Sequence, residues 1–249
     1  MNKPVKIYFV SDLHLGTPNK EETKKRELKF IRWLDMIQKD ATELYLLGDV
    51  FDMWFEYKRV IPRGYSRLFG KLAEISDSGI PIHFFTGNHD MWVFDYFTEE
   101  FNITIYRQPV TRVIAGKKFF IGHGDGLGNG DLGYKFIKKV FSSKINQWLF
   151  ARLHPNFALG MAEFFSRKSR AANAQYDEIF TSEEKEMLVQ FSKKHLEKEH
   201  IDYFIFGHRH LKLDIRLNKS SRYINLGEWV KGSSYGVFDG NEMILSEFL

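Results

Sequence analysis

The stretch "FFTGNHDMW", residues 84–92, runs from two aromatic residues directly into the tetrapeptide "GNHD" (87–90). The aromatic part belongs to "IPIHFFTG" (80–87), a short apolar run that is typical of a buried strand. The polar residues that follow favour turns, so we expect the strand to end where they begin. An amide, an imidazole and a carboxylate therefore stand at the tip of a buried strand.

The same arrangement recurs at four other predicted strands, over 6–11, 43–48, 117–124 and 202–208. The polar clusters at the five strand ends are "DLH" (12–14), "GDVFD" (48–52), "GNHD" (87–90), "GHGD" (122–125) and "GHRH" (207–210). Each cluster alone is compatible with an ordinary turn. Together they hold five of the nine histidines, and the carboxyl edge of an α/β sheet is where ligands bind. The ensemble predicts one shared site.

Strands and helices alternate in the first half of the chain, which predicts an α/β fold. Helices are expected over 21–39, 64–77, 132–171 (with a break at 154–156) and 182–199. The last of these is expected to begin at a capping box that includes Thr181 or Ser182, and only strands are expected after it. The sequence therefore predicts a single domain over 1–249, with a helical insertion at 131–175.

Composition limits the chemistry and the compartment. The chain has 249 residues, 43% of them hydrophobic, and no apolar run approaches the ~20 residues of a membrane span. The start "MNKPVKIYFVSD" lacks a secretory apolar region, so we expect a cytoplasmic protein. The absence of cysteine excludes thiolate ligands and a cysteine nucleophile. Any metal must be held by His, Asp, Asn or Glu.

Positive charge is concentrated in one segment. Residues 131–173 hold eight Lys/Arg and two acids, a net charge of +6, which leaves −2 for the remainder of the chain. The same segment is rich in aromatic and leucine side chains. It predicts either a packed helical pair with a solvated basic face, or a basic and apolar surface suited to an anionic membrane.

The polar clusters have the residue types and spacing of a metal centre. Residues two apart on an extended backbone point the same way, so Asp12 with His14, and His208 with His210, can each converge on one point. A glycine directly precedes four of the candidate ligands, which allows close backbone approach. Seven candidate ligands suit two ions rather than one, with Asp49 as the candidate bridge.

In their order and spacing, these motifs resemble those of the calcineurin-like metallophosphoesterases. The resemblance implies an αββα sandwich of two mixed sheets with a binuclear metal site at one edge. It makes Asn88 a ligand and a member of the catalytic group, His89 a catalytic residue, and Asp90 the residue that orients His89. It implies one ion held by Asp12, His14, Asp49 and His210, and a second held by Asp49, Asn88, His123 and His208. With these ligands Mn2+ is the expected ion, with Zn2+ and iron as alternatives.

Further stretches resemble the UDP-2,3-diacylglucosamine pyrophosphatases of lipid A synthesis. They are "GDVFDMW" (48–54), "HGDGLGNGDLGYKF" (123–136), "SRKSRAAN" (166–173) and "NLGEWV" (225–230). This resemblance implies hydrolysis to UMP and diacylglucosamine 1-phosphate, by a peripheral protein on the inner face of the cytoplasmic membrane. It also implies that the insertion is a lid that admits acyl chains. The best-known members have arginine at the position of His89. The implied substrate contacts are Trp54 (as a wall of the site), Asp131, Tyr134, Arg167, Ser169, Arg170 and Asn173.

Two other functions remain open on the sequence. A general phosphodiesterase or phosphatase would use the basic segment to bind nucleotides or nucleic acid, with the aromatic residues as base platforms. Nucleic acid is the less favoured partner. A scaffold that keeps the fold without chemistry is the third hypothesis, but a scaffold has no need of seven converging ligands. The sequence does not give the metal, the acyl-chain length or the oligomeric state.

Overall fold

The computed structural model describes residues 4–128, 132–177 and 179–249, apart from the side chains of 132–134 and 169–177. Strands and helices alternate through the first half, as expected. In chain order the elements are β1 (Ile7–Val10), α1 (Lys20–Ile37), β2 (Glu43–Leu47), α2 (Ser66–Asp77), β3 (Ile82–Phe85), α3 (Tyr96–Phe101), β4 (Thr104–Tyr106), β5 (Val110–Ile114), β6 (Lys117–Ile121), α4 (Leu132–Phe141), α5 (Lys144–Phe150), α6 (Pro155–Asp177), α7 (Met187–Leu196), β7 (Tyr203–Phe206), β8 (Lys212–Arg216), β9 (Arg222–Leu226), β10 (Ser234–Phe238) and β11 (Met243–Glu247).

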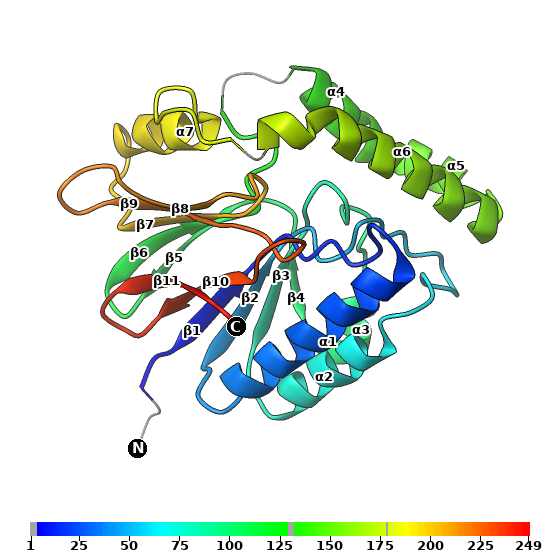
Figure 1. Cartoon of the computed structure of the whole chain (residues 1–249), viewed down its shortest axis with the longest axis horizontal. Coiled ribbons are helices and arrows are strands. Elements are labelled where there is room, and N and C mark those ends of the chain that lie inside the picture. Colours follow the sequence, from blue (N-terminus) through cyan, green and yellow to red (C-terminus); the bar gives the residue numbers. More distant parts are fainter. Residues whose placement is uncertain (1–3, 129–131, 178) are drawn as a thin grey trace.

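The strands form two mixed sheets that pack face to face (Figure 1). The first has the order β11-β10-β1-β2-β3-β4, in which β1 to β4 are parallel and β10 and β11 are antiparallel to their neighbours. The second has the order β5-β6-β7-β9-β8, with a parallel centre and antiparallel edges. Helices α1 to α3 cover the outer face of the first sheet, and α7 covers the second. The predicted αββα sandwich is confirmed.

Alternation along the strands builds the layers, because successive side chains point to opposite faces. In β1, Ile7 and Phe9 join the core between the sheets, whereas Tyr8 and Val10 face the helices. Strand β7 repeats this pattern, with Tyr203 and its alternate residue between the sheets and the other two residues against α7. Strands that are apolar on both faces are buried on both faces. Their polar ends are then the part of each central strand that lies outside the apolar core.

The helix ends differ from the sequence prediction at α7. This helix begins at Met187, and its N-cap residue, Glu186, makes no side-chain cap hydrogen bond. The predicted capping box is therefore wrong. The physical reason is that the chain forms a turn at 183–185 and the helix begins only after it, while both oxygens of the Glu186 carboxylate accept from Nε of the buried Arg209 at 2.9 and 3.1 Å. The N-cap side chain takes part in a tertiary pair rather than in a local cap.

Helices α4, α5 and α6 lie over the end of the sandwich at which the central strands terminate (Figure 1). Sequence analysis predicts one interruption in this segment, and the structure has two, after Phe141 and after Phe150. Helix α6 begins at Pro155, a favoured first position. Half of the exposed large apolar side chains of the described residues are on these helices, among them Phe136, Ile145, Trp148, Phe157, Phe164 and Phe165. None of the described helices has the length and apolar composition that a bilayer span requires.

Candidate metal centre

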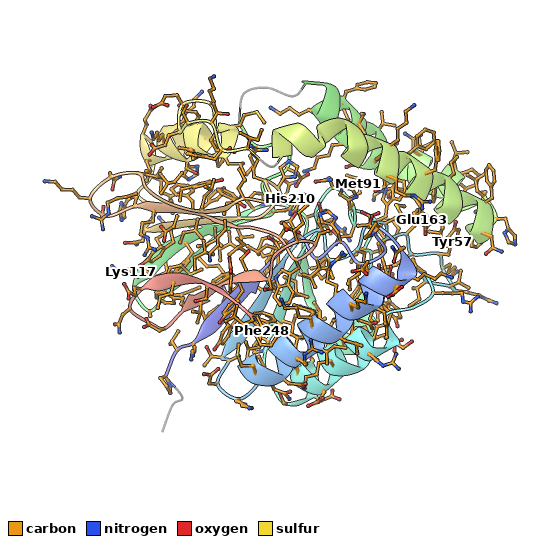
Figure 2. All side chains as sticks on the ribbon, in the orientation of Figure 1. Tyr57, Met91, Lys117, Glu163, His210 and Phe248 are labelled. Atoms are coloured by element: carbon orange, nitrogen blue, oxygen red, sulfur yellow. The ribbon has the colours of Figure 1, made fainter. Side chains whose placement is uncertain are left out.

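The five polar clusters lie at one end of the sandwich. Strands β1, β2 and β3 are neighbours in the first sheet, and β6 and β7 are neighbours in the second, so their carboxyl ends meet. Figure 2 shows His210 of the second sheet and Met91, which follows "GNHD", at this end beneath α4 to α6. Backbone hydrogen bonds extend the pairing past β1, from the N–H groups of Asp12 and His14 to the carbonyls of Gly48 and Asp49.

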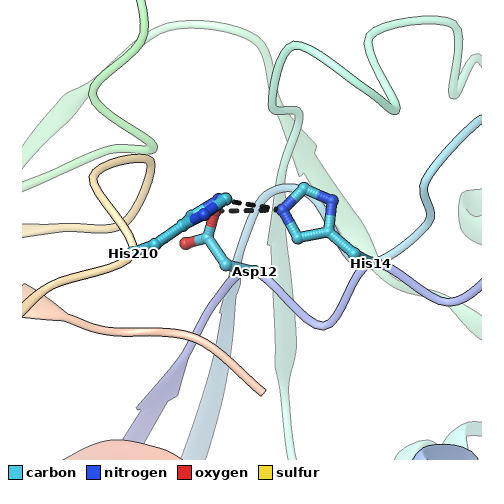
Figure 3. A group of neighbouring side chains, drawn as sticks. All are labelled: Asp12, His14 and His210. Carbon is cyan, nitrogen blue, oxygen red and sulfur yellow. Dashed lines mark hydrogen bonds and ion pairs between the residues drawn. The ribbon is translucent and has the colours of Figure 1, made fainter. Parts of the chain in front are cut away.

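Asp12, His14 and His210 point toward one another (Figure 3). The two Nε2 atoms of His14 and His210 are 3.0 Å apart. Oδ1 of Asp12 lies 3.6 Å from Nε2 of His14 and 3.3 Å from Nε2 of His210. This carboxylate oxygen is buried and has no hydrogen-bond partner among the described residues, which is costly unless a cation satisfies it. Two imidazole nitrogens and an unsatisfied carboxylate oxygen are a donor set that fits a divalent ion.

A second group gathers around Asn88. Its Oδ1 lies 3.3 Å from Nε2 of His123 and 3.0 Å from Nδ1 of His208. Asp49 lies between the two groups, because its Oδ2 is 3.4 Å from Nε2 of His123 and 3.8 Å from Nε2 of His14. The structure thus brings all seven sequence-predicted ligand residues into one centre, with the proposed bridge in the middle.

Backbone strain coincides with these residues. Asp12, His14, Asp49, His208 and His210 all have positive φ, between 45° and 70°. The left-handed region is costly for residues other than glycine and persists only where the surroundings enforce it. The strain therefore aims these side chains at the centre.

Glycines let backbone and ligands approach closely. A Cβ on Gly87 would lie 2.2 Å from Oδ1 of Asp49, and one on Gly207 would lie 2.5 Å from Oδ2 of Asp12. Gly48 combines a positive φ of 85° with a Cβ position 2.6 Å from Nδ1 of His123. No side chain fits at these three positions without displacing a candidate ligand.

His89 is held by a partner that the sequence does not predict. Its Nδ1 lies 2.9 Å from the carbonyl oxygen of Asp52 and 3.1 Å from Oγ of Ser166, which is on α6. A carbonyl only accepts, so Nδ1 carries a proton and Nε2 is the atom left for substrate. The carboxylate of Asp52 lies 3.8 Å from the ring. An insertion helix thus contacts the predicted catalytic histidine directly.

Asp90 does not orient His89, so that prediction is wrong. Its carboxylate is fully buried and accepts from the backbone N–H groups of Gly87, Val50, Asp49 and Phe51. These bonds tie the loop after β3 to the loop after β2. Burial, reinforced by the nearby charge of Asp49, raises the pKa of Asp90 to about 7.

The structure gives different outcomes for the predicted substrate contacts. Trp54 is fully buried in the first core cluster, where its Nε1 donates to Glu56, so it does not form a solvent-facing wall. This correction follows from its packing against neighbouring aromatic rings such as Phe51. Arg167 is exposed on α6, 3.9 Å from Glu163. Asp131 lies outside the described residues, as do the side chains of Tyr134, Ser169, Arg170 and Asn173.

The charge state of the centre follows from its carboxylates. Burial lowers the pKa of His123, but the charge of Asp49 raises it by more, giving a pKa of about 10. Burial and the charge on His123 together lower the pKa of His208 to about 4. In the protein stripped of ions, His123 is therefore protonated and His208 is neutral. One proton compensates part of the buried negative charge.

Sequence reasoning missed residues that support the centre. The pair formed by Arg209 and Glu186 is buried and fixes the loop between the ligands His208 and His210. The arginine inside "GHRH" was the available signal. Ser166 has no such signal in the sequence, because a serine on a helix is common and only the fold brings this one beside His89.

Comparison with known proteins identifies the family. The model of the calcineurin-like phosphoesterases matches residues 5–212. The chain belongs to this family. It is accordingly a metal-dependent hydrolase, and the hypothesis of a scaffold without chemistry is set aside.

Curated relatives span almost the whole chain. The UDP-2,3-diacylglucosamine hydrolase of Porphyromonas gingivalis is 37% identical over 96% of this chain and 96% of its own. A protein of the same name from a Shewanella species is 27% identical over 92% of this chain and 91% of its own. The solved structure of the E. coli phosphoesterase Yfce covers 96% of this chain and 91% of its own, with 14% identity and a TM-score of 0.46.

We expect Gly87→Ala to weaken ion binding by about 10- to 100-fold, the range for changes that displace a ligand from behind. The added Cβ would push the Asp49 carboxylate out of place. Competition with a chelator measures the affinity. Gly70→Ala is the matched control, since nothing lies within 4 Å of its added methyl group. Equal ion affinities in the two folded variants would contradict the close-packing argument.

Ion binding at pH 8 should release about one proton per chain, because a metal-bound imidazole must lose its proton. His123, with a pKa of about 10, supplies that proton, whereas Asp90, with a pKa of about 7, is already mostly ionised. Affinity therefore rises with pH up to about 10. Titration calorimetry in buffers of different ionisation enthalpy counts the protons. Binding without proton release would contradict the assigned charge of His123.

Proposed function

We propose that this chain hydrolyses the pyrophosphate of UDP-2,3-diacylglucosamine in lipid A synthesis, giving UMP and the diacylated sugar 1-phosphate. The observation that carries the proposal is the 37% identity to a UDP-2,3-diacylglucosamine hydrolase, which extends over 96% of both chains. Two observations from the structure support the proposal. The polar centre has the ligands of a phosphoester hydrolase, and the helices above it expose apolar surface.

The proposed centre holds two divalent ions, with Mn2+ expected from the oxygen and imidazole ligands. Asp12, His14 and His210 would hold one ion, and Asn88, His123 and His208 the other, with Asp49 shared. When bound, such a pair of ions polarises a phosphoryl oxygen and lowers the pKa of a water molecule. The chain itself positions the phosphorus between the two groups.

His89 is proposed to assist the leaving oxygen. Its Nδ1 is fixed by the carbonyl of Asp52, so its Nε2 side is available to donate when the ring is protonated. Oδ1 of Asp52 lies 3.8 Å from Nδ1 of the ring. A hydrogen-bonded imidazole in this position stabilises charge on the leaving phosphate. His89 also contacts Ser166 of α6, so the proposed step would take place beneath the insertion.

Helices α4 to α6 are proposed as a lid and a lipid-binding surface. Their exposed side chains include large apolar residues that a soluble nucleotide would not need. Each CH2 group that such a surface buries contributes ~0.8 kcal/mol. The helices also carry Lys144 and Lys168 at the surface, and Arg152 is exposed in the connection between α5 and α6. Cations beside apolar groups suit an anionic membrane, and we propose a peripheral position on the inner leaflet.

Removing both acyl chains should lower kcat/KM for UDP-glucosamine substrates by at least about 100-fold, since burial of about four CH2 groups already accounts for this factor. The assay compares the diacylated and deacylated substrates with purified enzyme and Mn2+. In 18O-labelled water the label should enter UMP, which locates attack at the phosphorus nearer uridine. Equal rates on both substrates would refute the lipid assignment and leave a general phosphodiesterase.

Replacing His89 with alanine should lower kcat by about 10²- to 10⁴-fold, the usual contribution of a positioned proton donor. Metal content should stay at the wild-type level, because the proposed ligands do not include His89. His200→Ala is the matched control, since that side chain is exposed and pairs only with Asp202 among the described residues. Loss of metal from His89→Ala would make it a ligand.

A further inference from the structure

A polar cavity of about 230 Å3 opens beside the centre. It extends from the ends of β3 and β4 to α4, and the candidate ligand His123 forms part of its wall. A water molecule occupies about 30 Å3 in the liquid, so the cavity holds roughly eight waters. That space is large enough for one planar ring inside the cavity, with the attached sugar at the cavity mouth. It is too small for two acyl chains.

Three basic side chains line this cavity, and one of them, Lys138, pairs with the carboxylate of Asp125, which also lines it. Arg107 is exposed, and its guanidinium donates to the carbonyls of Val93 at 2.7 Å and Phe94 at 3.2 Å. Nζ of Lys135 donates to the carbonyl of Gly128 at 2.6 Å. Among the described residues neither Arg107 nor Lys135 pairs with a carboxylate. Partial desolvation of the guanidinium lowers the pKa of Arg107, and the charges of Glu56 and Asp95 oppose this shift.

The cavity also has neutral polar groups that the protein leaves free. The hydroxyl of Thr86 and the amide of Gln108 line it, and neither makes a side-chain hydrogen bond within the described part of the chain. Each can both donate and accept. They match the edge of a pyrimidine such as uracil, in which a ring N–H lies between two carbonyl oxygens. Phe85 and Tyr106, stacked at 4.7 Å, add an aromatic wall.

We propose that this cavity is the subsite for the uridine half of the substrate, an inference that rests on the proposed function. It adjoins His123, whereas His89 lies beside His14 of the other ligand group, with ring centroids 4.9 Å apart. The nucleoside and the leaving phosphate therefore occupy different sides of the centre. Arg107 and Lys135 face the phosphate and ribose, and Gln108 and Thr86 read the base.

Binding of UMP to the Mn2+-loaded full chain, measured by titration calorimetry, tests the subsite without turnover. UMP should bind at least about tenfold tighter than ribose 5-phosphate, which lacks the base. Thr86→Val and Gln108→Ala should each lower UMP affinity about three- to tenfold, the value of one hydrogen bond, and leave ribose 5-phosphate affinity unchanged. Thr86→Val keeps the side-chain shape, so it tests the hydroxyl alone.

Lys135→Gln should lower the affinity for both ligands, and the matched control Lys139→Gln, an exposed residue on the same helix outside the cavity, should lower neither. The subsite is wrong if UMP binds no tighter than ribose 5-phosphate, or if the folded, metal-loaded cavity variants bind UMP as the wild type does. If the subsite fails either test but the enzyme still hydrolyses the diacylated substrate, the proposed function is unaffected. Cavity-dependent UMP binding without such turnover supports the subsite and refutes the proposed function.

Discussion

The buried carboxylate of Asp49 is the constraint around which the centre is arranged. It is 1% exposed, and its Oδ1 accepts from the backbone N–H of His89 at 2.9 Å. Burial alone would raise its pKa, but the charge of His123 and its neighbours holds that pKa well below the usual range. A buried charge is costly unless it is paired. Asp12 adds a second buried carboxylate beside it. The available protons neutralise only part of this negative charge, so the centre requires cations.

The double-sheet architecture supplies what this charge requires. Each sheet alone delivers only part of the set, since His14 and Asp49 follow strands of the first sheet and His123 and His208 follow strands of the second. The inter-sheet core fixes the two sets of loops relative to each other. Glycines at the contact points let the backbone approach the ligand side chains closely, and the left-handed backbone at five ligands turns those side chains toward the centre. Asp90 ties two of these loops together from below by accepting backbone hydrogen bonds.

Much of this could be predicted from the sequence, because it depends on local signals. Apolar runs that end in glycine and polar residues mark the carboxyl ends of buried strands, and those ends necessarily meet in a sheet. What failed depended on tertiary packing. The family resemblance implied Asp90 as the partner of His89, yet the backbone turns Asp90 inward and the carbonyl of Asp52 takes that place. Trp54 was expected at the site wall and is in the core, and the capping box expected at Thr181 or Ser182 precedes a helix that begins only at Met187.

The most direct test of the account is the metal content of Asp49→Ala compared with the wild type. The wild-type protein should hold two divalent ions per chain after dialysis against Mn2+, because the two ligand groups share this carboxylate. The variant should lose most of both ions together and remain folded, since alanine removes a buried charge without adding bulk. Elemental analysis with a parallel circular dichroism spectrum measures both properties. Two ions per chain in the folded variant would contradict the shared-carboxylate centre.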